Sequence, residues 1–254
     1  MRIARETWIV FARAMRLSLR NPVWIFIGLT QPILYLGLFG PLLEPMSQVP
    51  GIPPGESWQW FVPGILIQLG IFGAAFVGFG LVAEYRAGVV ERMRVTPASR
   101  IALLGGRVLR DVVVLLVQSV ILIVVAMLFF DLDAPLSGLV IGLGLVGLLG
   151  VSLAALSYAV ALTLKSEDAL APLLNGLALP VLLLSGILLP MSVAPSWLQT
   201  VSDFNPFRYV VDGARAVFRG DLDSSTALLG VVVTLALVLT GLVVGTRTFR
   251  RESA

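Results

Sequence analysis

Residues 84 to 100 carry the side chains of this chain that are best placed to contact another protein. Within this stretch Glu91, Arg92 and Arg94 present both signs of charge between two long apolar runs. The chemistry open to them is ionic contact, because the chain contains neither cysteine nor histidine. That composition excludes thiol nucleophiles, Ser-His dyads and the common zinc sites, so we expect no catalytic residue and no metal site. The alternative is that this positive loop only orients the chain in a membrane.

A second kind of chemistry, the binding of ATP phosphates, is also missing from the sequence. The phosphate-binding loop of ATPases, G-x-x-x-x-G-K-[ST], needs a lysine directly after a glycine. The one lysine of the chain, Lys165, instead follows Ala161-Leu162-Thr163-Leu164. We therefore expect no cofactor in this chain, and any work driven by ATP and Mg²⁺ would need a second polypeptide to bind them.

The elements that hold residues 84 to 100 in place are long and apolar. Hydrophobic residues make up 57% of the chain and charged residues 13%, and the mean hydropathy is +0.96, far from the values of soluble domains. Each charge-free run approaches or exceeds the ~20 residues that a helix needs to cross a bilayer, whereas a membrane β-barrel would show short alternating strands. The sequence predicts an all-α membrane protein, a single transmembrane domain over 1–254. Its six predicted spans are 23–43, 60–83, 112–130, 135–164, 169–191 and 227–246.

Basic residues predict the orientation of the spans. Five arginines lie in 1–22, six lie in 84–111, and three more follow the last span, while 44–59 and 131–134 contain no lysine or arginine. Because cytoplasmic loops of membrane proteins are enriched in these residues, we expect both termini to be cytoplasmic. Arg208, Arg215 and Arg219 are exceptions on the opposite side.

Two short helices are predicted next to the spans on that basic side. In residues 2–20 the arginines fall on one stripe of a helix and apolar residues cover the rest, so an interfacial helix is expected over 1–21. It could bind anionic lipid, contact a second polypeptide, or do both. Residues 87–95 are expected to form a second short helix, in which Gly88 would allow close backbone approach. Thr96-Pro97 is expected to cap and open the third span.

The segment 191–223 is too broken by proline to span. Asn205-Pro206 is expected to cap and start a helix that ends at Gly220. On this helix Arg208, Asp212, Arg215 and Arg219 follow spacings of 4, 3 and 4, which predicts one charge-paired face opposite an apolar face. The helix could act as an outer gate or as a packed interfacial cover.

Polar and glycine residues inside the spans suggest two further roles. Gln31, Gln68, Gln118 and Asn175 could line a substrate pathway, or could join helices by hydrogen bonds. The pairs Gly138-x-x-x-Gly142 and Gly241-x-x-x-Gly245 would permit close helix contact. We expect no carboxylate within the membrane, which argues against a proton-coupled or ion-coupled carrier.

Three motifs in the expected order resemble one family. The order Glu84, Gly88, Glu91, Thr96-Pro97 and Arg100 is similar to the E-x-x-x-G-x-x-E-x-x-x-x-T-P-x-x-R loop of type-two ABC transporter permeases, the group that includes the daunorubicin-resistance exporters. Phe61-Val62-Pro63-Gly64 resembles that family's entry to the second span. The outer segment from Ser185-Gly186 through Pro190 to Asn205-Pro206 resembles its outer motif, which forms short helices that dip into the outer leaflet. The resemblance covers nearly the whole chain.

The resemblance implies a permease subunit of an ATP-driven exporter in a bacterial inner membrane, with a lipophilic or amphipathic cargo. Its implied partners are two ATP-binding subunits and a second permease copy in a homodimer, and no nucleic acid is expected. A secondary transporter or a channel is the alternative. The residues implied to couple to the ATPase are Glu84, Gly88, Glu91, Arg92, Arg94, Thr96, Pro97 and Arg100, and the implied outer-gate residues are Ser185, Gly186, Pro190, Asn205 and Pro206.

Overall fold

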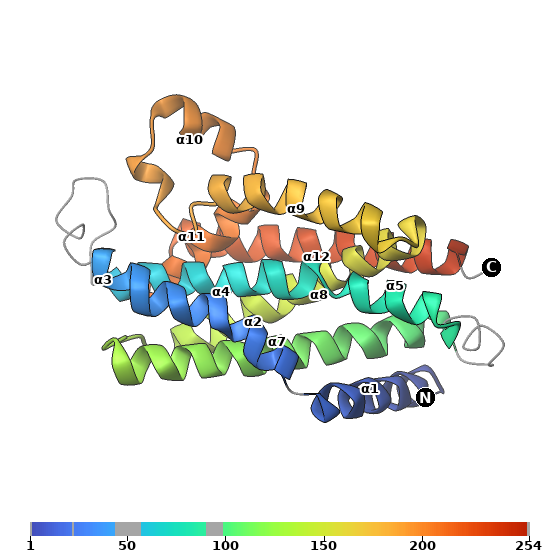
Figure 1. Cartoon of the computed structure of the whole chain (residues 1–254). Coiled ribbons are helices and arrows are strands. Elements are labelled where there is room, and N and C mark those ends of the chain that lie inside the picture. Colours follow the sequence, from blue (N-terminus) through green and yellow to red (C-terminus); the bar gives the residue numbers. More distant parts are fainter. Residues whose placement is uncertain (1, 22, 44–56, 90–98, 253–254) are drawn as a thin grey trace.

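Long helices running side by side dominate the computed structural model, which describes residues 2–21, 23–43, 57–89 and 99–252 (Figure 1). Six of these helical stretches are long and apolar enough to cross a membrane, and no strand occurs in the described ranges. The predicted all-α class with six spans is confirmed. Both termini lie at the same end of the bundle (Figure 1).

The first two spans are interrupted helices. The first consists of α2 (Val23–Leu34), the π-helical turn η1 (Tyr35–Phe39) and α3 (Gly40–Leu43). The second consists of α4 (Ser57–Ala75) and α5 (Gly78–Arg86), which are separated by a turn at residues 76 and 77. The sequence had predicted one unbroken helix in each case.

The other four spans are α7 (Arg100–Phe129), α8 (Leu136–Leu164), α9 (Glu167–Leu184) and α12 (Ser225–Glu252). Two boundaries correct the sequence prediction. The third span begins at Arg100, after an extended Ser99, rather than at residue 112, and the predicted opening at Thr96-Pro97 lies outside the described residues. The residues 100–111, which precede the predicted span 112–130, are therefore the first three turns of α7. The fifth span ends at Leu184 rather than at Met191, because a turn follows it.

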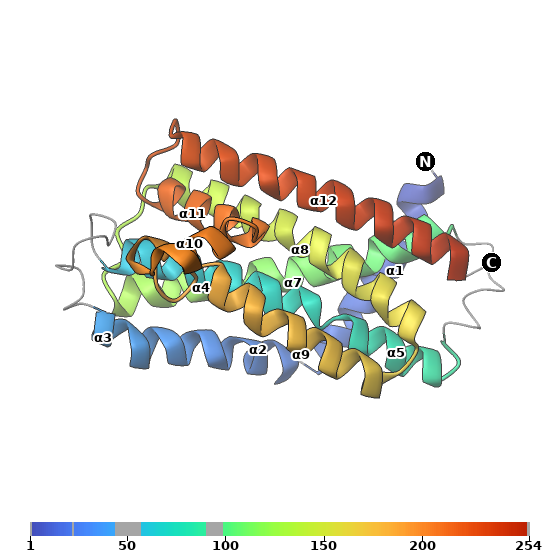
Figure 2. The same cartoon turned by 90° about the horizontal axis from the view of Figure 1, so that it is seen from above.

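A helix is present near the N-terminus as α1 (Arg2–Arg20), close to the predicted bounds 1–21. It packs against α7 and runs across the long axis of the bundle at the end that carries the termini (Figure 2). Large apolar side chains remain exposed on it, among them Trp8, Ile9 and Leu19. Its position in the plane of a membrane surface stays a prediction.

The α9–α12 connection, which we define as residues 185–224, lies at the opposite end. It contains η3 (Met191–Val193), α10 (Ser196–Ser202) and α11 (Pro206–Phe218). Helix α11 packs against α4, α8 and α12, whereas α10 projects away from the bundle (Figure 1). A dip into the outer leaflet stays a prediction for this connection.

Close helix contacts at glycines hold the centre of the bundle. A Cβ on Gly241 would lie 2.6 Å from the Ser152 carbonyl oxygen, and the Ser152 hydroxyl donates to the Leu237 carbonyl at 2.6 Å. Gly245 faces Ala155 in the same way, so the predicted contact at Gly241-x-x-x-Gly245 is confirmed between α12 and α8. Gly138 and Gly142 also permit a close approach, in their case of α11.

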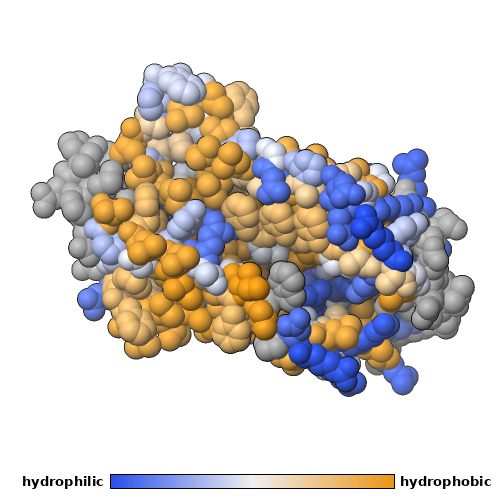
Figure 3. Space-filling view, in the orientation of Figure 1, coloured by the Kyte–Doolittle hydropathy of each residue, from blue (hydrophilic) through white to orange (hydrophobic). Residues whose placement is uncertain are grey.

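The surface of this bundle is divided along its length. On the face seen in Figure 3, hydrophobic residues cover most of the molecule and hydrophilic residues gather at the end that carries α1 and the termini. This distribution fits spans whose charged ends lie at one membrane surface.

Candidate functional site

The segment predicted to contact an ATPase begins with a sharp turn after α5. Glu91, Arg92, Arg94, Thr96 and Pro97 lie outside the described residues, as does most of the predicted helix 87–95. Its first two residues form a turn instead of a helix, with Gly88 at a φ of +68°. A Cβ on Gly88 would meet nothing within 4 Å. Glycine is therefore favoured here by the left-handed backbone, and not by the close approach that the sequence suggested.

Both ends of this segment are held by hydrogen bonds to carboxylates, one of which is also an ion pair. At its start, Glu84 on α5 accepts a hydrogen bond from Arg107 on α7, with 2.5 Å between Oε2 and Nη2. At its end, the Ser99 backbone N–H donates to the Glu6 carboxylate on α1 at 2.7 Å. The N–H groups at the start of a helix have no partner within the helix, so Glu6 caps α7 from outside. The loop thus connects α5 to α7 directly and reaches α1 through its last residue.

The predicted coupling residue Arg100 makes a different contact. Its Nη1 donates to the Arg250 carbonyl oxygen at 3.0 Å, which joins the start of α7 to the last turns of α12. Glu84 and Arg100, the two charged members of the predicted set that the structure describes, therefore contact α7 and α12 rather than each other.

A buried cluster of charges lies deeper along α7 and was missed by the sequence analysis. Asp111 is almost fully buried, and its Oδ1 lies 3.1 Å from the Arg110 Nε while its Oδ2 accepts from the Tyr158 hydroxyl on α8. Arg110 also donates to the Ser18 hydroxyl of α1 at 3.3 Å. We call Glu84, Arg107, Arg110, Asp111 and Tyr158 the α7 polar cluster. It ties α1, α5, α7 and α8 together.

Asp111 is a buried carboxylate that the sequence analysis did not single out, and the expectation of no carboxylate within the membrane stays a prediction. The residue directly precedes the predicted charge-free span 112–130, so it was not counted among the residues of a span. The Arg107–Asp111 spacing of four, which places both side chains on one helix face, was the signal that could have located it. Because Asp111 is paired with an arginine and hydrogen-bonded to a tyrosine, its charge is compensated within the protein.

A serine on α8 bridges the break in the second span. The Ser157 hydroxyl donates to the Ala75 carbonyl at 2.5 Å and accepts from the Gly78 backbone N–H at 2.9 Å. A Cβ on Gly78 would lie 2.7 Å from the Ser157 carbonyl oxygen, so this contact needs glycine. One side chain thus gives a hydrogen-bond partner to a carbonyl of the last turn of α4 and to an N–H group of the first turn of α5.

At the opposite end, Arg215 on α11 is buried in the bundle. Its Nε donates to the Trp60 carbonyl at 2.9 Å, and its Nη2 donates to the carbonyls of Gly186 and Ile187 at 2.7 and 3.1 Å. The guanidinium also lies 5.8 Å from the centre of the Trp60 ring. One side chain therefore joins α11 to the start of α4 and to the turn after α9.

The charged face predicted for α11 is only partly observed. Asp212 lies 3.7 Å from Arg208 and 3.6 Å from Arg215, as the spacing predicted, but Arg219 pairs with Asp221. Arg215 is 2% exposed, so it does not belong to an outer face. Burial lowers the pKa of Arg215 to about 10, against the opposing effect of Asp212, and the side chain therefore stays charged at neutral pH.

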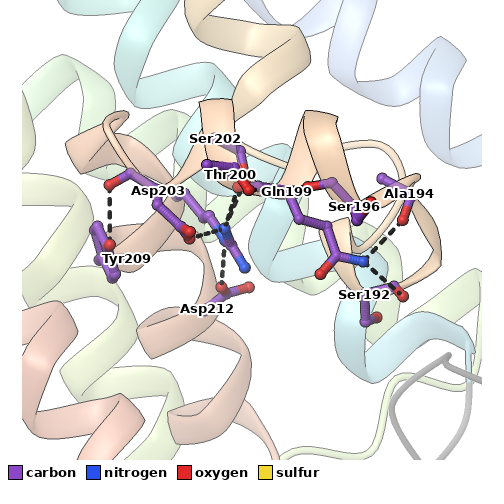
Figure 4. Close-up of polar contacts among 10 residues, drawn as sticks. Ser192, Ala194, Ser196, Gln199, Thr200, Ser202, Asp203, Tyr209 and Asp212 are labelled. Carbon is purple, nitrogen blue, oxygen red and sulfur yellow. Dashed lines mark hydrogen bonds and ion pairs between the residues drawn. The ribbon is translucent and has the colours of Figure 1, made fainter.

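Arg208 fixes α10 to α11, and Figure 4 shows its partners Ser202, Asp203 and Asp212. Its Nη1 donates to the Gln199 carbonyl at 3.1 Å and to the Ser202 hydroxyl at 2.6 Å, and it also pairs with Asp203. The Tyr209 hydroxyl donates to the Asp203 carbonyl at 2.9 Å. These contacts hold the projecting α10 at a defined position on α11.

The predicted outer-gate residues are found at the turns of the α9–α12 connection. Asn205 caps α11 as expected: its Oδ1 accepts from the Phe207 N–H at 3.1 Å, and its Nδ2 donates to the Val181 carbonyl of α9 at 3.0 Å. Pro206 occupies the first turn, and α11 ends at Phe218, two residues before Gly220. Ser185 is buried and donates to the Leu182 carbonyl, Gly186 has a φ of +72°, and Pro190 precedes η3. These residues shape the connection, and their role in gating stays a prediction.

The four polar residues predicted within the spans do not come together. Gln118 joins α7 to α2 by donating to the Ile25 carbonyl at 2.8 Å. Gln68 is buried in α4, and its Oε1 has no hydrogen-bond partner among the described residues. Gln31 and Asn175 are exposed and contact only their own helices, through Tyr35 and the Ala171 carbonyl. Gln118 therefore acts as a joint between helices, while Gln31 and Asn175 face outward.

This arrangement of six membrane-crossing helices defines a multi-pass membrane protein. Residues 5–218 match the family model of the ABC-2 type transporter, and the chain belongs to this family. The family is one of transport permeases, and membership implies an ABC ATP-binding subunit as partner.

Named relatives agree with this assignment. The chain is 31% identical over 204 residues to a putative transport permease, ycf38, of Porphyra purpurea, covering 78% of this chain and 69% of the relative. It is 27% identical over 215 residues to the ycf38 protein of Cyanophora paradoxa, covering 84% and 74%. It is also 23% identical over 247 residues to the daunorubicin resistance ABC transporter permease protein DrrB1 of Streptomyces coeruleorubidus, covering 95% and 85%. The resemblance stated from the sequence is confirmed.

Proposed function

We propose that this chain is the membrane-spanning subunit of an ATP-driven exporter, and that residues 87–99 receive the movement of its ATP-binding subunit. The observation that carries the proposal is the attachment of both ends of this loop. Glu84 and Arg107 link its start to α7, and Ser99 and Glu6 link its end to α1. A force applied to the loop would therefore move α5, α7 and α1 together.

The α7 polar cluster would carry this movement further into the bundle. Asp111 and Tyr158 connect α7 to α8, and α8 contacts α4, α5 and α12. Tight packing and paired charges make such a contact network stiff, so a displacement at the loop would be shared by most spans. The outer end would respond through α4, whose first turn is held by Arg215. In this proposal ATP and Mg²⁺ bind only to the partner subunit.

The proposed cargo is lipophilic or amphipathic, such as a drug, an antibiotic or a lipid. Support comes from the apolar composition of the spans and from the similarity to a permease named for daunorubicin resistance. The proposed location is a bacterial inner membrane with both termini cytoplasmic, which the distribution of arginines supports.

The experiment that tests the proposal uses the double variant Glu91→Ala/Arg94→Ala. If these side chains contact the ATP-binding subunit, co-purification of that subunit and ATP-dependent export should both fall by about tenfold or more, because charged contacts at an interface are lost. Arg247→Ala, which removes an exposed arginine of α12, is the matched control and should leave both unchanged. Full association and export by the double variant would contradict the assigned role. Export by the purified chain alone, without any ATP-binding subunit, would favour a secondary transporter or a channel instead.

We further propose that two copies of this chain pair through the face formed by α2 and α9. These two helices flank α4 on one side of the bundle in both views (Figures 1 and 2). Helix α9 is the least buried of the six spans and makes few contacts with other helices. It exposes Asn175 among leucines. An amide facing acyl chains is unfavourable, whereas a facing helix could accept its hydrogen bonds.

The pairing predicts a disulfide between copies of a single-cysteine variant. Because the chain has no cysteine of its own, Asn175→Cys introduces the only thiol. Oxidation in native membranes should give a cross-linked dimer on a non-reducing gel, provided the two α9 helices meet near this residue. Val232→Cys, on the exposed face of α12, is the control and should remain monomeric. Equal cross-linking of the two variants would contradict a specific α9 contact.

A further inference from the structure

Two contacts join the last turn of α5 to the beginning of α9. The Arg86 Nη1 lies 3.7 Å from the Glu167 Oε1. The Lys165 Nζ lies 5.7 Å from the centre of the Tyr85 ring, within the range of a cation–π contact. Helices α5 and α9 lie side by side at the end of the bundle that carries the termini (Figure 2). The end of α5 is therefore held on two sides, by α7 and by α9.

The two attachments of α5 differ in strength. Toward α7, Glu84 pairs with Arg107, whose side chain is 8% exposed. Toward α9, the side chains of Arg86 and Glu167 are 51% and 40% exposed. An exposed ion pair is weak because water solvates both groups when they separate, whereas breaking a buried pair leaves a charge without compensation. A movement of this end of α5 would therefore break the contact with α9 and keep the contact with α7.

Helix α9 is held more firmly at its opposite end. There the Asn205 Nδ2 donates to the Val181 carbonyl of α9 at 3.0 Å, and the buried Arg215 donates to two carbonyls of the turn that follows α9. At the near end α9 continues into α8 through the short connection 165–166 and meets α5 through the two exposed contacts. The helices α5 and α9 can therefore separate at this end while the other end of α9 stays in place.

The surface behind these contacts is apolar. Leu81 on α5 and Leu170 on α9 are 1% and 0% exposed and belong to one hydrophobic cluster. Two apolar helix faces within a membrane are separated at little cost when lipid or another lipophilic molecule fills the space between them. Separation of α5 from α9 would therefore open an apolar surface that suits a lipophilic molecule.

We propose that Tyr85, Arg86, Lys165 and Glu167 form a latch that closes an entrance for lipophilic cargo between α5 and α9. The latch opens when the ATP-binding subunit moves the loop of residues 87–99 and, with it, α5. Because its contacts are weak, it can open and close once in each transport cycle. This inference rests on the proposed function for the cargo and for the source of movement, but the opening of the latch can be measured without either.

The labelling rate of a buried thiol measures this opening. Leu170→Cys introduces the only thiol of the chain, and the purified variant in lipid nanodiscs, without any ATP-binding subunit, is treated with a water-soluble maleimide. Arg86→Glu in this background places two like charges at the contact and should raise the rate about fivefold to tenfold. The exchanged pair Arg86→Glu/Glu167→Arg should bring the rate back toward that of Leu170→Cys alone. Arg247→Glu, at an exposed position of α12 outside the contact, should leave it unchanged. Equal rates for Arg86→Glu and Arg247→Glu would overturn the latch.

A cross-link tests whether the entrance serves transport. Arg86→Cys/Glu167→Cys is joined by a short bifunctional methanethiosulfonate and is assayed with the ATP-binding subunit for export of the lipophilic dye rhodamine 6G. Export should fall at least tenfold after cross-linking and should return when dithiothreitol cleaves the link, while the ATP-binding subunit stays bound throughout. Undiminished export by the cross-linked variant would overturn the entrance. Absence of ATP-dependent export by the unmodified chain would count against the proposed function, and the labelling rates would still decide the latch.

Discussion

Replacing Arg215 with methionine is expected to lower the unfolding free energy of the protein by about 3–5 kcal/mol. The guanidinium donates three hydrogen bonds, to the carbonyls of Trp60, Gly186 and Ile187, and methionine removes this donor from all three. A charged group makes stronger hydrogen bonds than a neutral one, so the loss is larger than for an ordinary polar residue. Thermal unfolding of the purified chain in detergent measures the effect.

Two variants show whether the effect belongs to this site. Arg219→Met removes an arginine of the same helix whose partner, Asp221, is exposed, and it should cost less than about 1 kcal/mol. Arg215→Lys keeps the charge but cannot reproduce the forked geometry of the guanidinium, so its stability should lie between those of Arg215→Met and the unmodified chain. Equal unfolding temperatures for Arg215→Met and Arg219→Met would show that the three carbonyl contacts contribute little.

Replacing Asp111 with alanine is the second change with a large expected effect. It leaves Arg110 without its carboxylate and the Tyr158 hydroxyl without an acceptor inside the bundle. Breaking a buried pair by removing one partner costs about 3–5 kcal/mol, because the remaining charge is no longer compensated. Thermal unfolding should report this loss. Export should fall further than stability alone explains, if the cluster transmits movement from the loop to α8.

A double variant separates these causes. Arg110→Leu/Asp111→Leu removes both charges of the pair and should be more stable than Asp111→Ala, since no unpaired charge remains between these two residues. Tyr158→Phe deletes only the hydroxyl and should cost about 1 kcal/mol. If the double variant were no more stable than Asp111→Ala, compensation of charge could not be the reason for the effect. Normal export by a stable double variant would remove the cluster from the transmission path.

The spans could be predicted from the sequence because the feature that produces them, a long run without charged residues, can be read from neighbouring residues alone. A charge in hydrocarbon is costly, so charge-free runs of sufficient length indicate spanning helices wherever they occur. The same criterion failed for the first turns of α7. It treats every charged residue as solvated, and Arg107, Arg110 and Asp111 are stabilised by partners on α5, α1 and α8 that lie far away in the sequence.

The α9–α12 connection shows the same division between local and distant causes. The cap at Asn205 and the start of α11 at Pro206 were predicted, because a helix cap depends on residues that are neighbours in sequence. The burial of Arg215 was not predicted, since its acceptors come from residues 60, 186 and 187. Spacing alone suggested an exposed charged stripe, and only the packing of α11 against α4 shows which side faces inward.

The single hydroxyl that bridges the second span has a consequence for how this membrane helix can bend. Ser157 hydrogen-bonds both Ala75 and Gly78, so α4 and α5 can change the angle between them while their facing backbone ends keep a hydrogen-bond partner. These hydrogen bonds come from a neighbouring helix, so any swing of α5 would be passed to α8 rather than to α4. The second span can therefore bend at residues 76 and 77 about its contact with Ser157, between the two ends of the bundle.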